Sequence, residues 1–219
     1  KTSSAASDVY KRQLLDLINN NFCGWTRQLP ERSNFKLLDQ DIYCDYLIVG
    51  AGYTGLSAAR KLSDIMKDKK IILIDAQLAG EGGSSRNSGY LVDTTLNDGF
   101  TSNSDKENYV KKTKIYHLGI EAVRKFIKEY QVDCDWNECG KYFASSKEQD
   151  ETKAQSFSKL LNSLGFKNKI LFNKELTEKL GTPFYKIGVF TSGGILLNPG
   201  KLARACLLYT SPSPRDSDQ

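Results

Sequence analysis

The stretch CDYLIVGAGYTGLSAARKL (Cys44–Leu62) constrains the fold of this chain more than any other. It opens with a β-rich apolar run, Tyr46–Val49, of the length expected for a strand buried on both faces. Three glycines follow at once, and apolar residues then recur at helical spacing. A second apolar run, Ile71–Ile74, comes next. A strand, glycine turn, helix and strand within about 30 residues predict a βαβ unit, and so an α/β fold with a parallel sheet.

The glycines at positions 50, 52 and 55 have the spacing that a dinucleotide pyrophosphate requires. A side chain at Gly50 would block the tight turn, and one at Gly52 would hold the pyrophosphate away. One at Gly55 would push the helix off the strand. Asp75, at the end of the second run, could accept both hydroxyls of an adenosine ribose. The pattern favours a site for an ADP-containing dinucleotide over the alternative, a glycine turn that binds no ligand. It leaves open whether the dinucleotide carries flavin or nicotinamide.

A small-residue stretch, GEGGSSRNSGYLVD (Gly80–Asp93), follows closely behind Asp75. A nicotinamide enzyme would usually continue here with a helix and a third strand. Small residues around Arg86 and Asn87 instead let backbone donors approach the rest of a long cofactor, and Arg86 can offset phosphate charge. A flexible polar linker is the alternative interpretation.

The remaining sequence predicts elements that are divided between two lobes. A short amphipathic helix is expected at Leu14–Trp25, ahead of the βαβ unit. Asn198-Pro199 is typical of a helix start, with Asn as the cap and Pro at the first position. The other expected elements are a helix from about Lys106 to Tyr130, a strand at Lys141–Ser146, a helix at Glu148–Gly165, a strand at Lys186–Ser192 and a turn at Gly193-Gly194.

Composition excludes several other classes of protein. Charged residues make up 26% of the chain and basic ones are interleaved with acidic ones, so the net charge of +5 does not indicate a nucleic-acid partner. No apolar run approaches the roughly 20 residues that cross a bilayer, and no signal peptide is visible. The single histidine, His117, is expected to face solvent on a helix. The cysteines do not have the spacing of metal ligands, so we expect no metal site and expect reduced thiols in a cytoplasmic protein. The five cysteines are Cys23, Cys44, Cys134, Cys139 and Cys206.

The two ends, Lys1–Gln13 and Cys206–Gln219, are small, polar and without apolar periodicity, and both resemble translated linker sequence. We therefore expect non-native flanks around an interior piece of a longer protein, truncated at its C-terminal side. The expected divisions are a helix and connector at 14–43, a Rossmann-like portion at 44–135, a partial α+β substrate lobe at 136–197 and a return helix at 198–205.

The combination resembles the D-amino-acid-oxidase-like superfamily of FAD-dependent oxidoreductases, nearest to the gamma-glutamylputrescine oxidase group. The resemblance is carried, in order, by DYLIVGAGYTGLSAA, the SSRNSG loop, VDCDWNECGKYFAS and GGILLNPGKLARA. It covers the chain from about Asn21 to Ala205. Asp75 stands where the family often has glutamate, which preserves the ribose role.

The resemblance implies FAD as the cofactor, and it implies a role for each matching position. The glycine loop with Tyr53 and Thr54 would bind the pyrophosphate, and Asp75 with Ala76 would bind the adenosine ribose. Ser84, Ser85, Arg86 and Asn87 would line the cofactor as far as the flavin ring, and Gly89 would allow backbone approach near that ring. For Asn198 and Pro199, a helix cap and a substrate contact are both open.

The resemblance also implies the reaction, which is oxidation of a C–N bond in a small amine or amino acid. Hydride passes to the flavin, and dioxygen reoxidises the flavin with formation of hydrogen peroxide. The catalytic residues stay unknown. The alternatives are an FAD dehydrogenase of a hydroxy acid or polyol phosphate that passes electrons to a quinone, a nicotinamide-dependent dehydrogenase, and a partial domain that is inactive by itself.

Overall fold

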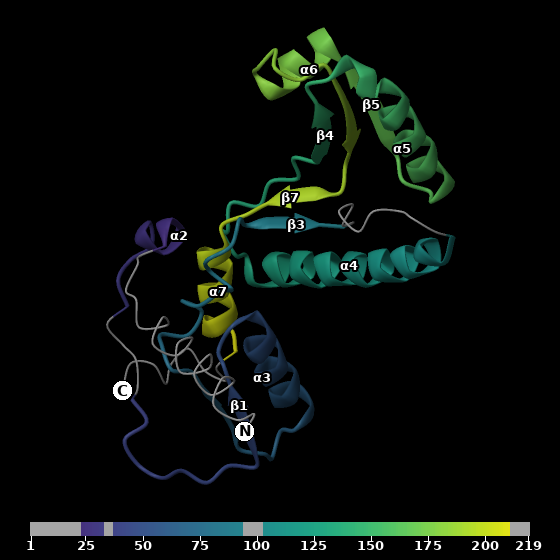
Figure 1. Ribbon diagram of the computed structural model, residues 1–219. Helices are drawn as coiled ribbons and strands as arrows, with labels where there is room; N and C mark the ends of the chain where they lie inside the picture. The colour runs from purple at the N-terminus through teal and green to yellow at the C-terminus, as the bar shows by residue number, and fades with distance from the viewer. Residues whose placement is uncertain (1–22, 33–36, 94–102, 211–219) are drawn as a thin grey trace, which may run out of the picture.

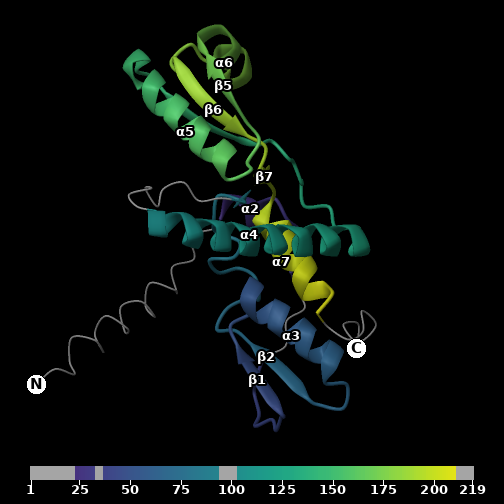
Figure 2. The same ribbon diagram turned by 90° about the vertical axis from the view of Figure 1, so that its right-hand side faces the viewer.

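A computed structural model describes residues 23–32, 37–93 and 103–210 of the chain. Two lobes lie at opposite ends of the molecule, and a long helix, α4 (Asn103–Tyr130), crosses between them (Figures 1 and 2). The described part has three small sheets, formed by β1–β2, β3–β7 and β4–β6–β5. The mixed α/β class and the two lobes are as the sequence predicts.

The lower lobe is the predicted βαβ unit. Strands β1 (Tyr46–Val49) and β2 (Ile71–Ile74) pair in parallel, and the connecting helix α3 (Tyr53–Ile65) packs on one face of the pair. The expectation that β1 is buried on both faces is wrong for these residues, because Leu47 is 55% exposed and Val49 is 76% exposed. Within the described ranges α3 covers only the face opposite these two side chains.

The upper lobe is a three-stranded antiparallel sheet covered by two helices. Its central strand β6 (Ile187–Thr191) pairs with β4 (Lys141–Ser145) and with β5 (Asn168–Phe172). The interior is apolar, and the rings of Phe143 and Phe157 meet edge to face at 5.4 Å between centroids. The two helices are α5 (Glu151–Ser163), which a short 3-10 turn η1 (Glu148–Asp150) precedes, and α6 (Asn173–Leu180).

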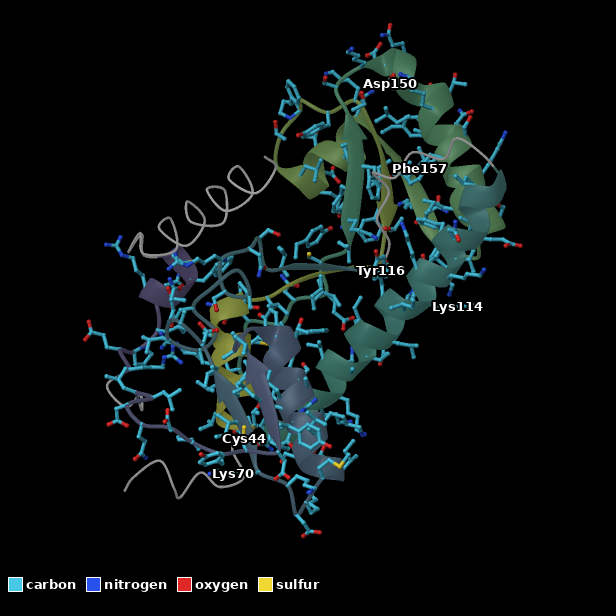
Figure 3. The ribbon with its side chains drawn as sticks, turned by 60° about the horizontal axis from the view of Figure 1, so that its bottom comes forward. Cys44, Lys70, Lys114, Tyr116, Asp150 and Phe157 are labelled. Atoms are coloured by element: carbon cyan, nitrogen blue, oxygen red, sulfur yellow. The ribbon has the colours of Figure 1, made fainter. Side chains whose placement is uncertain are left out.

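Figure 3 labels Asp150 and Phe157 in the upper lobe, and Cys44 and Lys70 at the far end of the βαβ unit. Cys44 and Lys70 precede β1 and β2, which start side by side because the two strands run parallel. The glycine loop therefore lies at the other end of this pair, toward the middle of the molecule.

A short antiparallel pair, β3 (Tyr90–Val92) with β7 (Gly194–Leu196), joins the lobes. Asp93, just after β3, is buried and makes an ion pair of 2.5 Å with Lys141 of β4, which is also buried. His117 of α4 lies 3.7 Å from the same carboxylate, and its side chain is half exposed, as expected. The strand β3 was not predicted, because it has only three residues and follows directly on the small-residue loop.

The last described helix, α7 (Pro199–Leu208), returns to the βαβ unit. Asn198 caps it as predicted: its Oδ1 accepts from the Lys201 amide at 3.0 Å, and the residue is fully buried. The expected end of the native fold at Ala205 falls inside this helix. Cys206 packs on the central apolar cluster, and Tyr209 stacks on Tyr130 at 4.4 Å between ring centroids. The cluster consists of Phe126, Cys134, Leu197 and Leu202.

The other elements match the sequence predictions unevenly. α4 and α5 lie where helices were expected, to within a few residues at each end. The pair β5–α6 was not predicted. The N-terminal helix expected at Leu14–Trp25 falls mostly outside the described residues, and the structure has a single turn there, α2 (Gly24–Arg27). No helix within the described ranges is both long and apolar enough to cross a bilayer.

Candidate functional site

The loop between β1 and α3 needs its glycines for two separate reasons. Gly50 has a φ of +102°, a conformation that L side chains rarely adopt, and nothing lies within 4 Å of the place a Cβ would take. A Cβ on Gly55 would lie 1.9 Å from the Gly50 carbonyl oxygen and 3.3 Å from Ile48. Gly55 thus lets α3 sit against β1, while the loop stays open on the side of Gly50.

The start of α3 leaves backbone donors available. The first bond within the helix runs from the Leu56 amide to the Gly52 carbonyl at 2.9 Å. The amides of Gly52, Thr54 and Gly55 meet no acceptor among the described residues. Such unpaired N–H groups, together with the positive end of the helix dipole, form a site suited to phosphate.

Asp75 lies beside this loop. Its Oδ2 accepts from the Ala51 amide at 2.6 Å, and its Oδ1 accepts from the Gln77 amide at 2.9 Å. Two carboxylate oxygens can accept about four hydrogen bonds, so the exposed carboxylate retains capacity for two hydroxyl donors. Asp75 therefore points at the glycine loop and can bind a sugar there.

The predicted cofactor-lining loop (residues 80–89, the lining loop) is attached directly to the glycine loop. The Gly80 amide donates to the Ala51 carbonyl at 2.9 Å, and the Tyr53 amide donates to Ser84 Oγ at 3.0 Å. Ser84 Oγ would also lie 2.7 Å from a Cβ on Gly52. A side chain at position 52 would therefore displace the Ser84 hydroxyl from the mouth of the loop.

The remaining polar members of the lining loop differ in exposure. Ser85 is buried, and its hydroxyl donates to the Gly80 carbonyl. Arg86 and Asn87 are exposed. Arg86 Nε donates to the Glu81 carbonyl at 2.8 Å, and Asn87 Oδ1 accepts from the Gly89 amide at 2.8 Å. The structure thus presents Arg86 and Asn87 at the surface, while Ser85 holds the loop together.

Two predicted residues, Tyr53 and Gly89, have a side chain or packing directed elsewhere. The Tyr53 side chain turns into the core, where its hydroxyl donates to the Pro199 carbonyl at 2.8 Å, and burial raises its pKa. A Cβ on Gly89 would lie 2.1 Å from the Leu197 carbonyl oxygen, so the close approach at Gly89 is to β7 and its end. Ala76 is exposed beside Asp75. Only the backbone of Tyr53 belongs to the site.

The structure adds residues that sequence reasoning did not identify. Arg32 and Arg204 each make an ion pair of 3.2 Å with Glu81 at the start of the lining loop. Cys23 and Trp25 donate hydrogen bonds to carbonyl groups of the same loop. Their positions show no periodicity or spacing that relates them to the loop, so no local signal could have identified them.

Taken together, the glycine loop, the unpaired amides and Asp75 define a dinucleotide-binding flavoprotein or dehydrogenase fold. The chain belongs to the family of FAD dependent oxidoreductases, whose family model matches residues 45–209. FAD is the cofactor of this family. The open glycine loop and its three unpaired amides fit the diphosphate of that cofactor.

Two known proteins whose sequences resemble this chain are also named as oxidoreductases. The chain is 28% identical over 187 residues to a probable oxidoreductase OrdL of Haemophilus influenzae, and the match covers 79% of this chain and 41% of that protein. It is 34% identical over 120 residues to gamma-glutamylputrescine oxidoreductase of Escherichia coli, covering 52% of this chain and 27% of that protein. The chain thus spans well under half the length of these relatives.

Solved structures show the same fold at low sequence identity. A glycine oxidase of Bacillus cereus superposes with a TM-score of 0.56 at 16% identity, over 77% of this chain and 44% of that one. An L-amino acid deaminase of Proteus myxofaciens gives a TM-score of 0.59 at 17% identity, over 83% of this chain and 39% of that one. These values establish the fold and are consistent with a partial chain.

Proposed function

We propose that the loop at Gly50, Gly52 and Gly55 binds the diphosphate of FAD through the amides at the start of α3. In this proposal Asp75 accepts the hydroxyls of the adenosine ribose. The rest of the cofactor would then run along the lining loop, next to Ser84, Ser85, Arg86 and Asn87. The observation that supports this most is the coincidence of unpaired amides and a carboxylate at one open loop.

We further propose that the whole protein oxidises a C–N bond of a small amine or amino acid. When bound, FAD would supply the electron chemistry by accepting the hydride from the carbon beside the nitrogen and passing both electrons to dioxygen, which would become hydrogen peroxide. The amine would also lose its N–H proton and so become an imine, which water would hydrolyse to a carbonyl compound and a free amine. The support is the 34% identity to a gamma-glutamylputrescine oxidoreductase. The reaction is proposed for the whole protein, and the chain by itself is proposed to be inactive.

The contribution of the described residues is to bind and orient the cofactor. The dipole and amides of α3 would hold the diphosphate in one place, and Arg86 would offset its charge.

All five cysteines are free, which fits a reducing compartment such as the cytoplasm.

A second candidate is an FAD dehydrogenase that acts on a polyol phosphate. One solved structure with the same fold, at a TM-score of 0.55 and 17% identity, is an L-alpha-glycerophosphate oxidase of Mycoplasma pneumoniae. The fold therefore also occurs in an enzyme whose name refers to no amine.

The decisive experiment uses the natural full-length protein with its bound flavin. Gamma-glutamylputrescine, other amines, amino acids and glycerol phosphate are each added without oxygen, and bleaching of the flavin absorbance is followed. Air is then admitted and peroxide is measured. Bleaching by an amine with stoichiometric peroxide is expected, whereas bleaching only by glycerol phosphate, with turnover only when a quinone is added, would overturn the proposal.

A further inference from the structure

A segment that precedes the family domain is attached to the cofactor-lining loop. The family match begins at residue 45, whereas α2 lies at Gly24–Arg27. Trp25 Nε1 donates to the Asn87 carbonyl at 2.8 Å, and Cys23 Sγ donates to the Ser85 carbonyl at 3.2 Å. Both bonds join residues 62 positions apart. The segment therefore runs alongside the loop, and residues 23 and 25 bond to residues 85 and 87 respectively.

These two bonds fix which way the loop peptides face. A trans peptide is planar, and its N–H points opposite to its C=O. With the Asn87 carbonyl turned toward Trp25, the amide of Ser88 points to the other side of the loop. The segment therefore determines on which side the loop presents the Ser88 amide, whereas the Arg86 amide, which belongs to the same peptide as the Ser85 carbonyl, already donates to the Gly83 carbonyl at 3.3 Å.

The segment is itself held firmly enough to do this. Thr26 and Leu29 pack on α7 at Gly200, where a Cβ would approach Leu29 to 3.3 Å. Arg204 of α7 donates to the Pro30 carbonyl at 2.5 Å. α2 thus contacts both α7 and the lining loop.

The ion pairs of Glu81 tie the same elements together. Arg32 from the segment and Arg204 from α7 both lie 3.2 Å from Glu81, whose side chain is 17% exposed. Burial and the neighbouring Arg204 lower the pKa of Arg32, while Glu81 opposes that shift. One carboxylate at the start of the loop therefore connects both supporting elements.

An open depression of about 540 Å³ lies where the segment meets the loop. Cys23, Trp25 and Gln28 line it from the segment, and Arg86 and Asn87 line it from the loop. The two exposed residues of the lining loop that were predicted to line the cofactor, Arg86 and Asn87, thus share one concave surface with α2.

We propose that Trp25 and Cys23 are positioning residues of the flavin site, which they serve by holding the carbonyls of Ser85 and Asn87 so that the loop presents the Ser88 amide and its exposed side chains to the cofactor. The inference rests on the proposed role of Arg86 and Asn87 at the flavin. The FAD site of this protein then includes a segment outside the family domain.

The test compares Trp25→Phe with Trp136→Phe in the natural full-length protein. Both variants keep an aromatic ring and lose one indole hydrogen bond, because Trp136 Nε1 donates to Glu138 Oε1 at 3.1 Å, away from the loop. Trp25→Phe is expected to weaken FAD binding by roughly 2- to 10-fold, the effect of one hydrogen bond. It should also change the visible circular dichroism of the bound flavin, while the melting temperature of the apoprotein matches that of Trp136→Phe.

A second pair keeps the inference testable if Trp25→Phe does not fold. Cys23→Ser retains a donor and should keep the wild-type affinity and flavin spectrum, whereas Cys23→Ala should lose part of both. Wild-type binding of FAD with equal results for Trp25→Phe and Trp136→Phe, or for Cys23→Ser and Cys23→Ala, would overturn this inference and leave the proposed function intact. Absence of FAD binding by the wild type would overturn both.

Discussion

At the scale of single residues, the centre of the molecule combines an open polar loop with a tightly packed apolar cluster. Cys134 belongs to that cluster together with Phe126, Leu197 and Leu202, and Cys206 packs against it. Burial raises the pKa of each thiol from an ordinary value near 9.0 to about 11, and Asp133 and Asp135 add to the shift at Cys134. These cysteines therefore act as small apolar residues rather than as nucleophiles.

This shift predicts a loss of stability at high pH. As the pH rises above about 9, the thiols of the unfolded chain lose their protons first, and those of the folded chain stay protonated until about pH 11. The free energy of unfolding should fall across this window. Its slope is at most about 1.4 kcal/mol per pH unit for each thiol, because each thiol releases one proton. Urea unfolding at pH 8, 9.5 and 11 measures it. A Cys134→Ala/Cys206→Ala variant should fall less steeply, and an unchanged slope would contradict the assignment.

A site residue could be predicted from the sequence only where its role imposes a residue type at a fixed spacing from its neighbours in the chain. Gly50, Gly55 and Asp75 are recognisable because the turn, the helix contact and the strand end impose residue types at fixed spacing. Trp25 and Cys23 could not be recognised, since their partners lie 62 positions away and any carbonyl group would accept them. Ser84 was predicted as a lining residue, but its bond to the Tyr53 amide needed the three-dimensional structure.

At the scale of elements, long periodic segments were predictable and short ones were not. α3 and α4 have enough turns to show an apolar face, and α4 begins within a few residues of the predicted Lys106 and ends at the predicted Tyr130. β3 has three residues, and β5 runs directly into α6, so neither pattern extends far enough to be identified. The exposed face of β1 was missed because an apolar run shows that a strand can be covered, not that it is.

The end of α7 supplies the test at this scale. Tyr209 stacks on Tyr130 and meets Phe126 edge to face at 6.2 Å, although the sequence assigned it to a non-native flank. Tyr209→Ala should destabilise the chain by about 1–3 kcal/mol through lost burial and ring contacts. The matched control is Tyr43→Ala, since Tyr43 is 90% exposed. Equal urea midpoints for the two variants would show that α7 does not need its last turn.

At the scale of the whole molecule, the site lies where separate parts of the chain converge. The βαβ unit supplies the glycine loop, α7 returns from the upper lobe to support it, and α2 contacts the lining loop from outside the family domain. The short β3–β7 pair and the Asp93–Lys141 ion pair connect this centre to the upper lobe. The upper lobe is thereby held at the end of the molecule opposite the βαβ unit (Figure 1).

The central claim is that the open glycine loop holds the diphosphate of FAD, and Gly52→Val tests it most directly. Gly52 has a φ of −82°, which valine can adopt, so the variant changes the space in the loop and not the backbone. Titration of FAD into the full-length apoprotein should give an affinity about 10- to 100-fold weaker than wild type. The control Gly119→Val, on the exposed face of α4 with nothing within 4 Å, should bind as wild type does. Wild-type affinity in Gly52→Val would contradict the account.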